Sequence, residues 1–170
     1  MKISKFAYCL IPLVGTVLIA QDDLLIGNIS GLTVNPIFYG IVLVYCFCMG
    51  LTFAKTIKKI CNRKWAIVGL IAVVMAIIVP YSFDNSLVAG LHILNAYLGF
   101  TVFSIVLFKT INNFKIYNYQ LAKYLNCFAM LIYLIILFMA MHFMVINGLM
   151  EIIYLWMIDI VLGMIELKAN

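Results

Sequence analysis

Charged residues are scarce in this chain of 170 residues: they make up 10% of it, whereas hydrophobic residues make up 67%. A soluble domain is about a quarter charged and about half apolar, so this composition excludes an ordinary soluble domain. The apolar residues also lie in long runs rather than in amphipathic stripes, which is typical of an integral membrane protein. Because these runs take up nearly the whole chain, we predict a single transmembrane domain over residues 1–170.

The sequence also lacks the short motifs of several well-understood catalytic sites. It has no GxSxG nucleophile motif, no glycine-rich phosphate loop and no dinucleotide fingerprint. None of the five cysteines forms a CxxC pair, so we interpret them as small apolar residues and expect no disulfide. The spacings HExxH and HxxxH are absent as well. The sequence therefore leaves open whether the protein is an enzyme.

Long apolar runs predict an all-α fold, a bundle of six transmembrane helices. The predicted spans are about 6–21, 36–54, 65–83, 86–108, 124–146 and 149–167. We interpret the first run as a helix rather than a signal peptide, because Leu18 and Ala20 do not give the small-x-small cleavage pattern. In the third run, Ala72 and Ala76 are one helical turn apart and predict a surface for close helix packing.

The distribution of charge predicts the orientation in the membrane. All 11 basic residues fall in or beside four segments, residues 1–5, 55–64, 109–123 and 168–170. Basic residues are enriched in cytoplasmic segments, so this pattern places both the N- and C-termini in the cytoplasm, in a multi-pass protein of the cell membrane. The net charge of +5 is then an orientation signal, and we expect no nucleic-acid partner.

Polar residues within or beside the spans are candidates for function. Such residues are costly in a lipid-spanning helix and usually face a protein interior or a cavity. With a rise of about 1.5 Å per residue, His92 lies roughly 9 Å and His142 roughly 6 Å below the outer ends of their helices. The candidate lining of a pocket near the outer leaflet is Asp84, His92, Asn95, His142, Glu151 and Asp159.

Several interpretations of these residues remain open. One interpretation is purely structural: His92, Asn95, His142 and Asp159 hydrogen-bond between helices and hold the bundle together. Our leading interpretation is a polar pocket that faces the outer leaflet and binds or handles a lipid or a small amphiphile. An alternative is a metal site in which His92 and His142 hold zinc, in a membrane-embedded hydrolase or transferase. A further alternative is a membrane subunit that captures a solute for a transporter. Membrane lipids, a second copy of the chain and a transporter subunit are the partners these interpretations imply.

Several short segments together suggest a family resemblance. They are Asn28-Ile-Ser-Gly-Leu32, Asn35-Pro-Ile-Phe38, Pro80 and Asp84 before Leu91-His92, Ala96 and Phe100, and Gly148-Leu-Met-Glu151. This pattern resembles a prokaryotic family of six-helix membrane proteins that is distantly similar to the eukaryotic DRAM and FRAG type. The resemblance implies six helices with a polar cluster at the outer face, in which Asp84, His92 and Glu151 are the corresponding positions. It also implies lipid handling, because the eukaryotic relatives are linked to lysosomal membranes and lipid-anchor remodelling.

Overall fold

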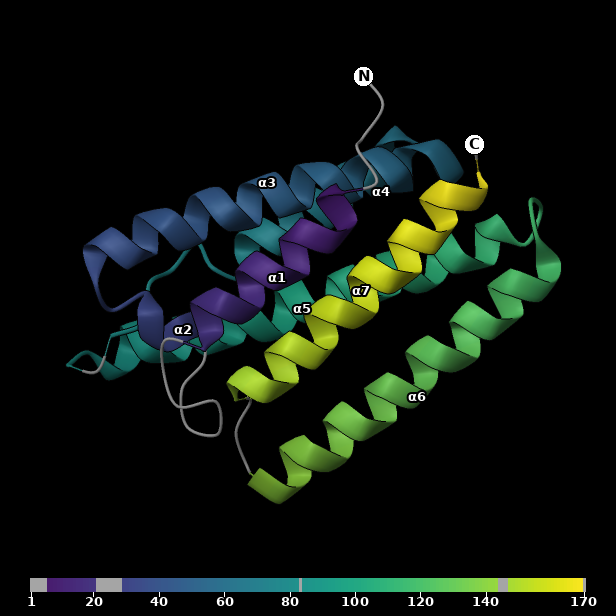
Figure 1. The fold of residues 1–170 in the computed structure, drawn as a ribbon. Coiled ribbons are helices and arrows are strands. Elements are labelled where there is room, and N and C mark those ends of the chain that lie inside the picture. The colour runs from purple at the N-terminus through teal and green to yellow at the C-terminus, as the bar shows by residue number, and fades with distance from the viewer. Residues whose placement is uncertain (1–5, 21–28, 83, 144–146, 170) are drawn as a thin grey trace. The chain divides into compact units, whose positions relative to one another are not determined.

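A computed structural model describes residues 6–20, 29–82, 84–143 and 147–169, and over these residues its regular structure is entirely helical (Figure 1). The helices are α1 (Ala7–Ile19), α2 (Ile29–Leu32), α3 (Pro36–Ile60), α4 (Arg63–Met75), α5 (Ser86–Phe114), α6 (Tyr119–Phe143) and α7 (Gly148–Lys168). The all-α prediction is therefore confirmed for the described residues. Contacts divide the chain into two compact units, which we call the terminal unit (residues 1–28 and 110–170) and the central unit (residues 29–109).

Helix length decides which of the predicted spans can cross a membrane. In the described residues, α3, α5, α6 and α7 are long and apolar enough to do so. Helices α1 and α4 have 13 residues each. A helix of that length covers roughly 20 Å, less than the hydrocarbon thickness of roughly 30 Å. The chain is thus a membrane-embedded protein in which four of the six predicted spans are helices of spanning length.

The third predicted span, 65–83, is wrong as a continuous helix. Helix α4 ends at Met75, and the chain from 76 to 82 continues without an α-helix. Pro80 explains the early end: its ring clashes with the carbonyl four residues earlier, and it has no N–H to donate. It also disfavours helical geometry at the preceding residue, Val79.

The basic segments between the helices are shorter than predicted. Helix α3 continues to Ile60 and α4 begins at Arg63, while α5 continues to Phe114 and α6 begins at Tyr119. Asparagine residues explain why α4 and α6 begin so soon after the preceding helices end. The side-chain oxygen of an asparagine cap accepts a hydrogen bond from a backbone N–H in the first turn of the helix. Asn62 accepts from the N–H of Trp65 at 3.1 Å, and an equivalent cap precedes α6. Helical backbone therefore replaces most of the predicted loops 55–64 and 109–123.

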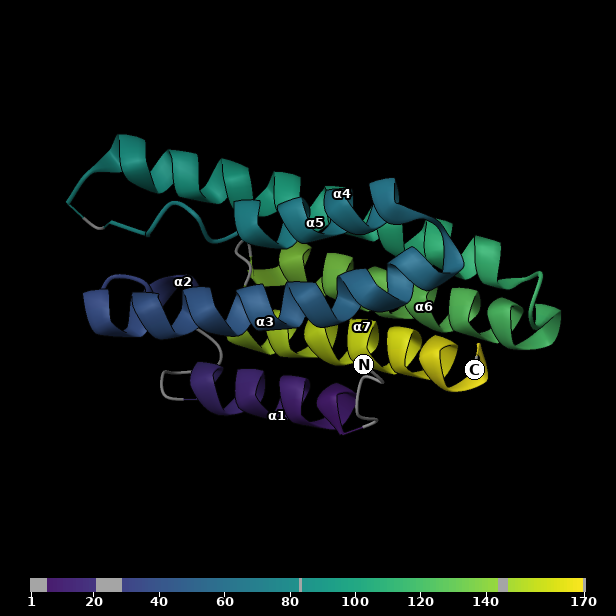
Figure 2. The same ribbon diagram turned by 90° about the horizontal axis from the view of Figure 1, so that it is seen from above.

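Close helix contacts hold the central unit together, in which α3 and α4 run side by side (Figure 2). Phe53 of α3 packs against Phe103 of α5 with ring centroids 5.7 Å apart. A Cβ at Gly99 of α5 would lie 2.4 Å from the carbonyl oxygen of Ala72 and 3.0 Å from the Cβ of Ala76. Only glycine allows this approach, so the predicted packing surface at Ala72 and Ala76 is confirmed.

The terminal unit is built around α7, which packs against both α1 and α6 (Figure 1). The indole N–H of Trp156 donates to the Thr16 hydroxyl of α1 at 3.1 Å. About two turns further along α7, Gly163 lies against Tyr8 near the start of α1. Since the later residue of α7 meets the earlier residue of α1, the two helices are antiparallel. On the other side of α7, the hydroxyl groups of Tyr133 and Tyr154 are 3.3 Å apart.

Candidate functional site

The six candidate residues divide between the two units. Asp84, His92 and Asn95 belong to the central unit, and His142, Glu151 and Asp159 belong to the terminal unit. The candidates therefore form two groups of three, one in each unit. Their grouping into one pocket stays a prediction.

In the central unit, His92 lies beside the irregular segment that follows α4. Three side chains from outside this segment hydrogen-bond to its backbone. The Tyr39 hydroxyl donates to the Ile78 carbonyl at 2.8 Å. The Thr33 hydroxyl accepts from the N–H of Tyr81 at 2.9 Å. The third bond joins Nδ1 of His92 to the carbonyl of Val79.

The His92 bond has a defined direction. A carbonyl can only accept, so Nδ1 of His92 carries the proton and donates to the Val79 oxygen. The imidazole is 3% exposed and meets the Tyr81 ring edge-on, with centroids 5.6 Å apart. Backbone without helical hydrogen bonds is tolerated in a membrane protein only where other groups satisfy it. The geometry therefore favours the structural interpretation for His92: it stabilises the chain where α4 has ended.

Thr33 and Tyr39 have a comparable role, and the sequence analysis missed both. Thr33 is 2% exposed, as a buried acceptor for a backbone N–H should be. A signal was present in the chain, because Pro80 predicts a helix break whose backbone groups need partners inside a membrane protein. The missing information was which neighbouring side chains would supply those partners.

The other two residues of the central group do not join this hydrogen-bonded cluster in any bond that the structure defines. Asp84 is exposed in the turn before α5, and Asn95 is half-buried one helical turn after His92. The neighbouring Asn85 caps α5, with its side-chain oxygen 3.1 Å from the N–H of Leu87. Asp84 thus lies just before α5, and its place on the outer side of the membrane stays a prediction.

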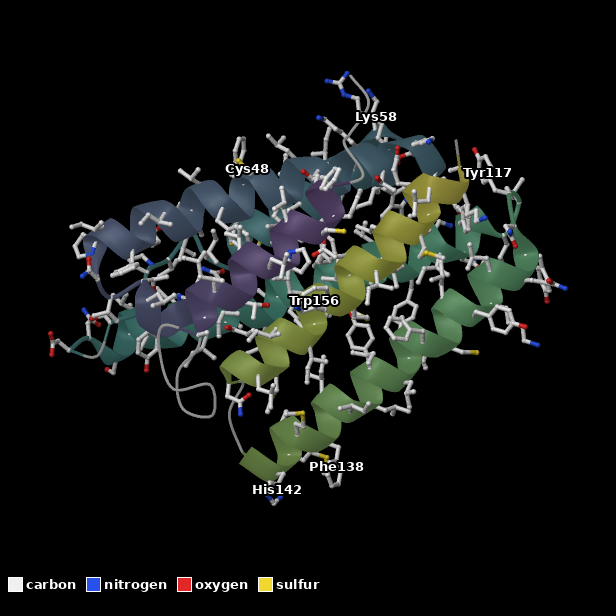
Figure 3. The ribbon with its side chains drawn as sticks, in the orientation of Figure 1. Cys48, Lys58, Tyr117, Phe138, His142 and Trp156 are labelled. Atoms are coloured by element: carbon white, nitrogen blue, oxygen red, sulfur yellow. The ribbon has the colours of Figure 1, made fainter. Side chains whose placement is uncertain are left out.

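In the terminal unit, His142 lies near the end of α6 and Glu151 lies near the start of α7. His142 is exposed in the last turn of α6, at the opposite end of the unit from Tyr117 (Figure 3). Glu151 is half-buried in the first turn of α7, and its N–H donates to the Asn147 carbonyl at 3.2 Å. Asn147 also caps α7 through its side chain, which accepts from the N–H of Met150 at 3.1 Å. These residues therefore lie where α6 ends and α7 begins.

Asp159 is the most unusual residue of the set. It lies near the middle of α7 and is 2% exposed. Neither of its carboxylate oxygens has a hydrogen-bond partner in the part of the chain that the structure describes. Buried carboxylates are normally paired or hydrogen-bonded, because removing a charged group from water is costly. An ionisable residue in this situation inside a membrane helix is a functional-site candidate.

The surroundings of Asp159 are set by the packing of α1 on α7. Asp159 follows Trp156 by three residues and precedes Gly163 by four, so the three share one side of α7. Trp156 and Gly163 both contact α1, and Figure 3 shows Trp156 where α7 passes α1. Because the helices are antiparallel, Asp159 lies at about the level of Pro12. Helix α1 has no charged residue along Ala7–Ile19, so it supplies no counter-ion.

The predicted metal site gains no ligand group from the structure. Within the described ranges, no three or more His, Cys, Asp or Glu side chains come together as a metal would require. Structural and catalytic zinc sites use three or four protein ligands. The zinc assignment to His92 and His142 stays a prediction.

No family model, no curated protein and no solved structure matches the chain. The resemblance to the DRAM and FRAG type is therefore left as a sequence-based expectation.

Proposed function

We propose that this protein binds the polar group of a lipid or small amphiphile within the membrane, and that Asp159 is the residue that receives it. The observation that carries the proposal is the burial of the Asp159 carboxyl with no protein partner among the described residues. An unsatisfied buried polar group costs about 1–3 kcal/mol, and more if it is charged. A ligand that supplies hydrogen-bond donors would offset this cost.

The position of Asp159 restricts how such a ligand arrives. Eleven residues separate it from the start of α7 at Gly148, which corresponds to roughly 16 Å along the helix. A molecule from aqueous solution would have to cross that depth. A molecule already dissolved in the bilayer reaches it sideways, and this favours an amphiphile over a water-soluble substrate.

The proposed topology has six crossings with both termini in the cytoplasm of a cell-membrane protein. Antiparallel packing in the terminal unit supports it, because the start of α1 and the end of α7 lie at the same end. Lys123 and Lys168 are at this end, and Glu151 is at the other. In the central unit, the chain continues beyond the short helix α4 through turns and irregular backbone from 76 to 82, and six crossings require this segment to complete the third one.

Thiol labelling tests the topology. A variant that keeps Cys61 as its sole cysteine carries a thiol in the turn between α3 and α4. A membrane-impermeant maleimide should label it only after the cells are permeabilised. The matched variant carries Asp84→Cys as its sole thiol and should be labelled on intact cells. Labelling of Cys61 on intact cells would reverse the proposed orientation.

Native mass spectrometry tests the binding proposal. The protein is released from detergent micelles, and the masses of retained small molecules are compared between the parent and Asp159→Asn. We expect the parent to retain an amphiphile that Asp159→Asn loses, because the amide presents one acceptor oxygen where the carboxylate presents two. Glu166→Gln, on the same helix, is the matched control and should retain it. Equal retention by the parent and Asp159→Asn would contradict the proposal.

The family resemblance and the other functions considered from the sequence gain no support from the described structure. Membership of the DRAM and FRAG type would add lipid handling by analogy alone. A metal-dependent hydrolase, a solute-capturing transporter subunit and a homo-oligomer are favoured by no contact within the described residues. They stay predictions.

A further inference from the structure

The chemistry around Asp159 also restricts the class of ligand. This inference rests on the proposed function, because it names the class of amphiphile that Asp159 would bind. A neutral carboxyl group has one O–H donor and one carbonyl acceptor. Protonation would therefore remove the charge of Asp159 but leave two polar atoms without partners among the described residues. A proton alone does not satisfy the site.

A metal cation is also a poor match. Calcium takes six to eight oxygen ligands, and magnesium takes six. Asp159 belongs to no group of three or more potential metal ligands in the described part of the chain. The single carboxylate could supply only two of the oxygens that such an ion requires.

A primary ammonium group satisfies the same carboxylate without further ligands. It carries one positive charge and three N–H donors, so it can neutralise Asp159 and donate to both oxygens at once. Charged hydrogen bonds of this kind are shorter and stronger than those between neutral groups. Neither α1 nor the middle of α6 offers a competing cation, since Lys123 lies at the start of α6.

Aromatic residues on both sides of Asp159 point to the same class of ligand. The Trp156 indole lies one turn before it on α7, and Tyr8 of α1 packs against Gly163 one turn after it. Cations are attracted to the faces of such rings. We propose that this protein binds a small amphiphile carrying a primary amine, with the ammonium group at Asp159 between α1 and α7.

The size of the ligand follows from the depth of the site. Asp159 is roughly 16 Å from the outer end of α7, whereas the headgroups of bilayer lipids lie at the membrane surface. A single-chain amine can enter sideways between helices, but a two-chain lipid would have to carry its headgroup into the hydrocarbon. Helix α1 has only 13 residues and contains Pro12, which removes one backbone donor. Of the two helices beside Asp159, α1 therefore has fewer backbone hydrogen bonds than α7.

The test compares probes that share a dodecyl chain and differ in the headgroup. Dodecylamine, dodecyltrimethylammonium, dodecanol and dodecyl sulfate are titrated against the detergent-solubilised full chain, and bound probe is counted by native mass spectrometry. Dodecylamine should bind about ten- to a hundredfold more tightly than the trimethylammonium probe, which has no N–H donor. This comparison uses the parent protein and does not depend on whether a variant folds.

Variants then connect the preference to Asp159. Asp159→Asn should weaken dodecylamine binding about ten- to a hundredfold, while Glu166→Gln should change it less than about twofold. Far-UV circular dichroism confirms that both variants keep the parent helix content. If none of the four probes binds stoichiometrically, the proposed function itself fails. If probes bind but dodecanol or the trimethylammonium probe binds as tightly as the amine, or Asp159→Asn keeps the preference, only the amine assignment fails.

Discussion

The hydrogen bond from His92 to the Val79 carbonyl leads to a prediction that separates a structural role from a ligand-binding one. The imidazole makes two contacts, the hydrogen bond and the edge-on packing against Tyr81. His92→Phe keeps an aromatic ring and removes the donor. His92→Asn keeps an N–H close to the position of Nδ1 and removes the ring. Together, the two variants measure the contacts separately.

The magnitudes follow from the geometry. A carbonyl that loses its donor without access to water costs about 1–3 kcal/mol, which is the expected loss of unfolding free energy in His92→Phe. An edge-on aromatic pair with centroids 5.6 Å apart contributes about 0.5–1.5 kcal/mol, the expected loss in His92→Asn. His92→Ala loses both contacts, and we expect about 2–4 kcal/mol.

The assay is unfolding by sodium dodecyl sulfate in mixed micelles, followed by far-UV circular dichroism with no added ligand. His142→Ala is the control, because this histidine is exposed in the last turn of α6. A substitution at such a position changes stability by about 0.5 kcal/mol or less. If His92→Phe unfolds at the same detergent fraction as the parent, the hydrogen bond does not stabilise the fold, and the structural interpretation of His92 is refuted.

Three further predictions use the same unfolding assay or hydrogen exchange. Gly99→Ala should lower the free energy of unfolding by about 1–3 kcal/mol, since its Cβ would lie 2.4 Å from a backbone oxygen of α4. Gly90→Ala, on the same helix with nothing within 4 Å, should leave it unchanged or raise it; equal effects would contradict the packing argument. Thr33→Val should expose the Tyr81 amide to faster exchange, measured by mass spectrometry, and unchanged exchange would show that the 2.9 Å bond is not protective. Asp159→Leu should raise the free energy of unfolding by about 1–3 kcal/mol, because it replaces polar atoms that have no partner among the described residues; a loss of stability would show that the carboxyl is already satisfied.

Composition was sufficient to predict the helical class, because a run of apolar residues long enough to cross a membrane needs no tertiary information. The same reasoning extended the third span to residue 83. Hydropathy measures side chains, and the side chains around Pro80 are apolar. The helix ends because of the backbone, through a ring that clashes and an N–H that is absent.

His92 shows how far sequence reasoning reaches into the candidate site. A polar side chain is costly in a membrane helix, and this cost correctly predicted that His92 has a specific partner. That partner is a backbone carbonyl, and no side-chain pattern reveals which carbonyl a broken helix leaves available. Thr33 and Tyr39 escaped notice for the same reason, since a hydroxyl near a helix start has no distinctive spacing.

The hydrogen bond between Trp156 and Thr16 has a practical consequence. The chain has two tryptophans, so Trp65→Phe would leave Trp156 as the single tryptophan, at the contact between α1 and α7. Indole emission shifts to longer wavelength when the ring meets water. The emission wavelength of Trp156 would therefore report whether α1 is packed on α7 or has separated from it, without any attached dye.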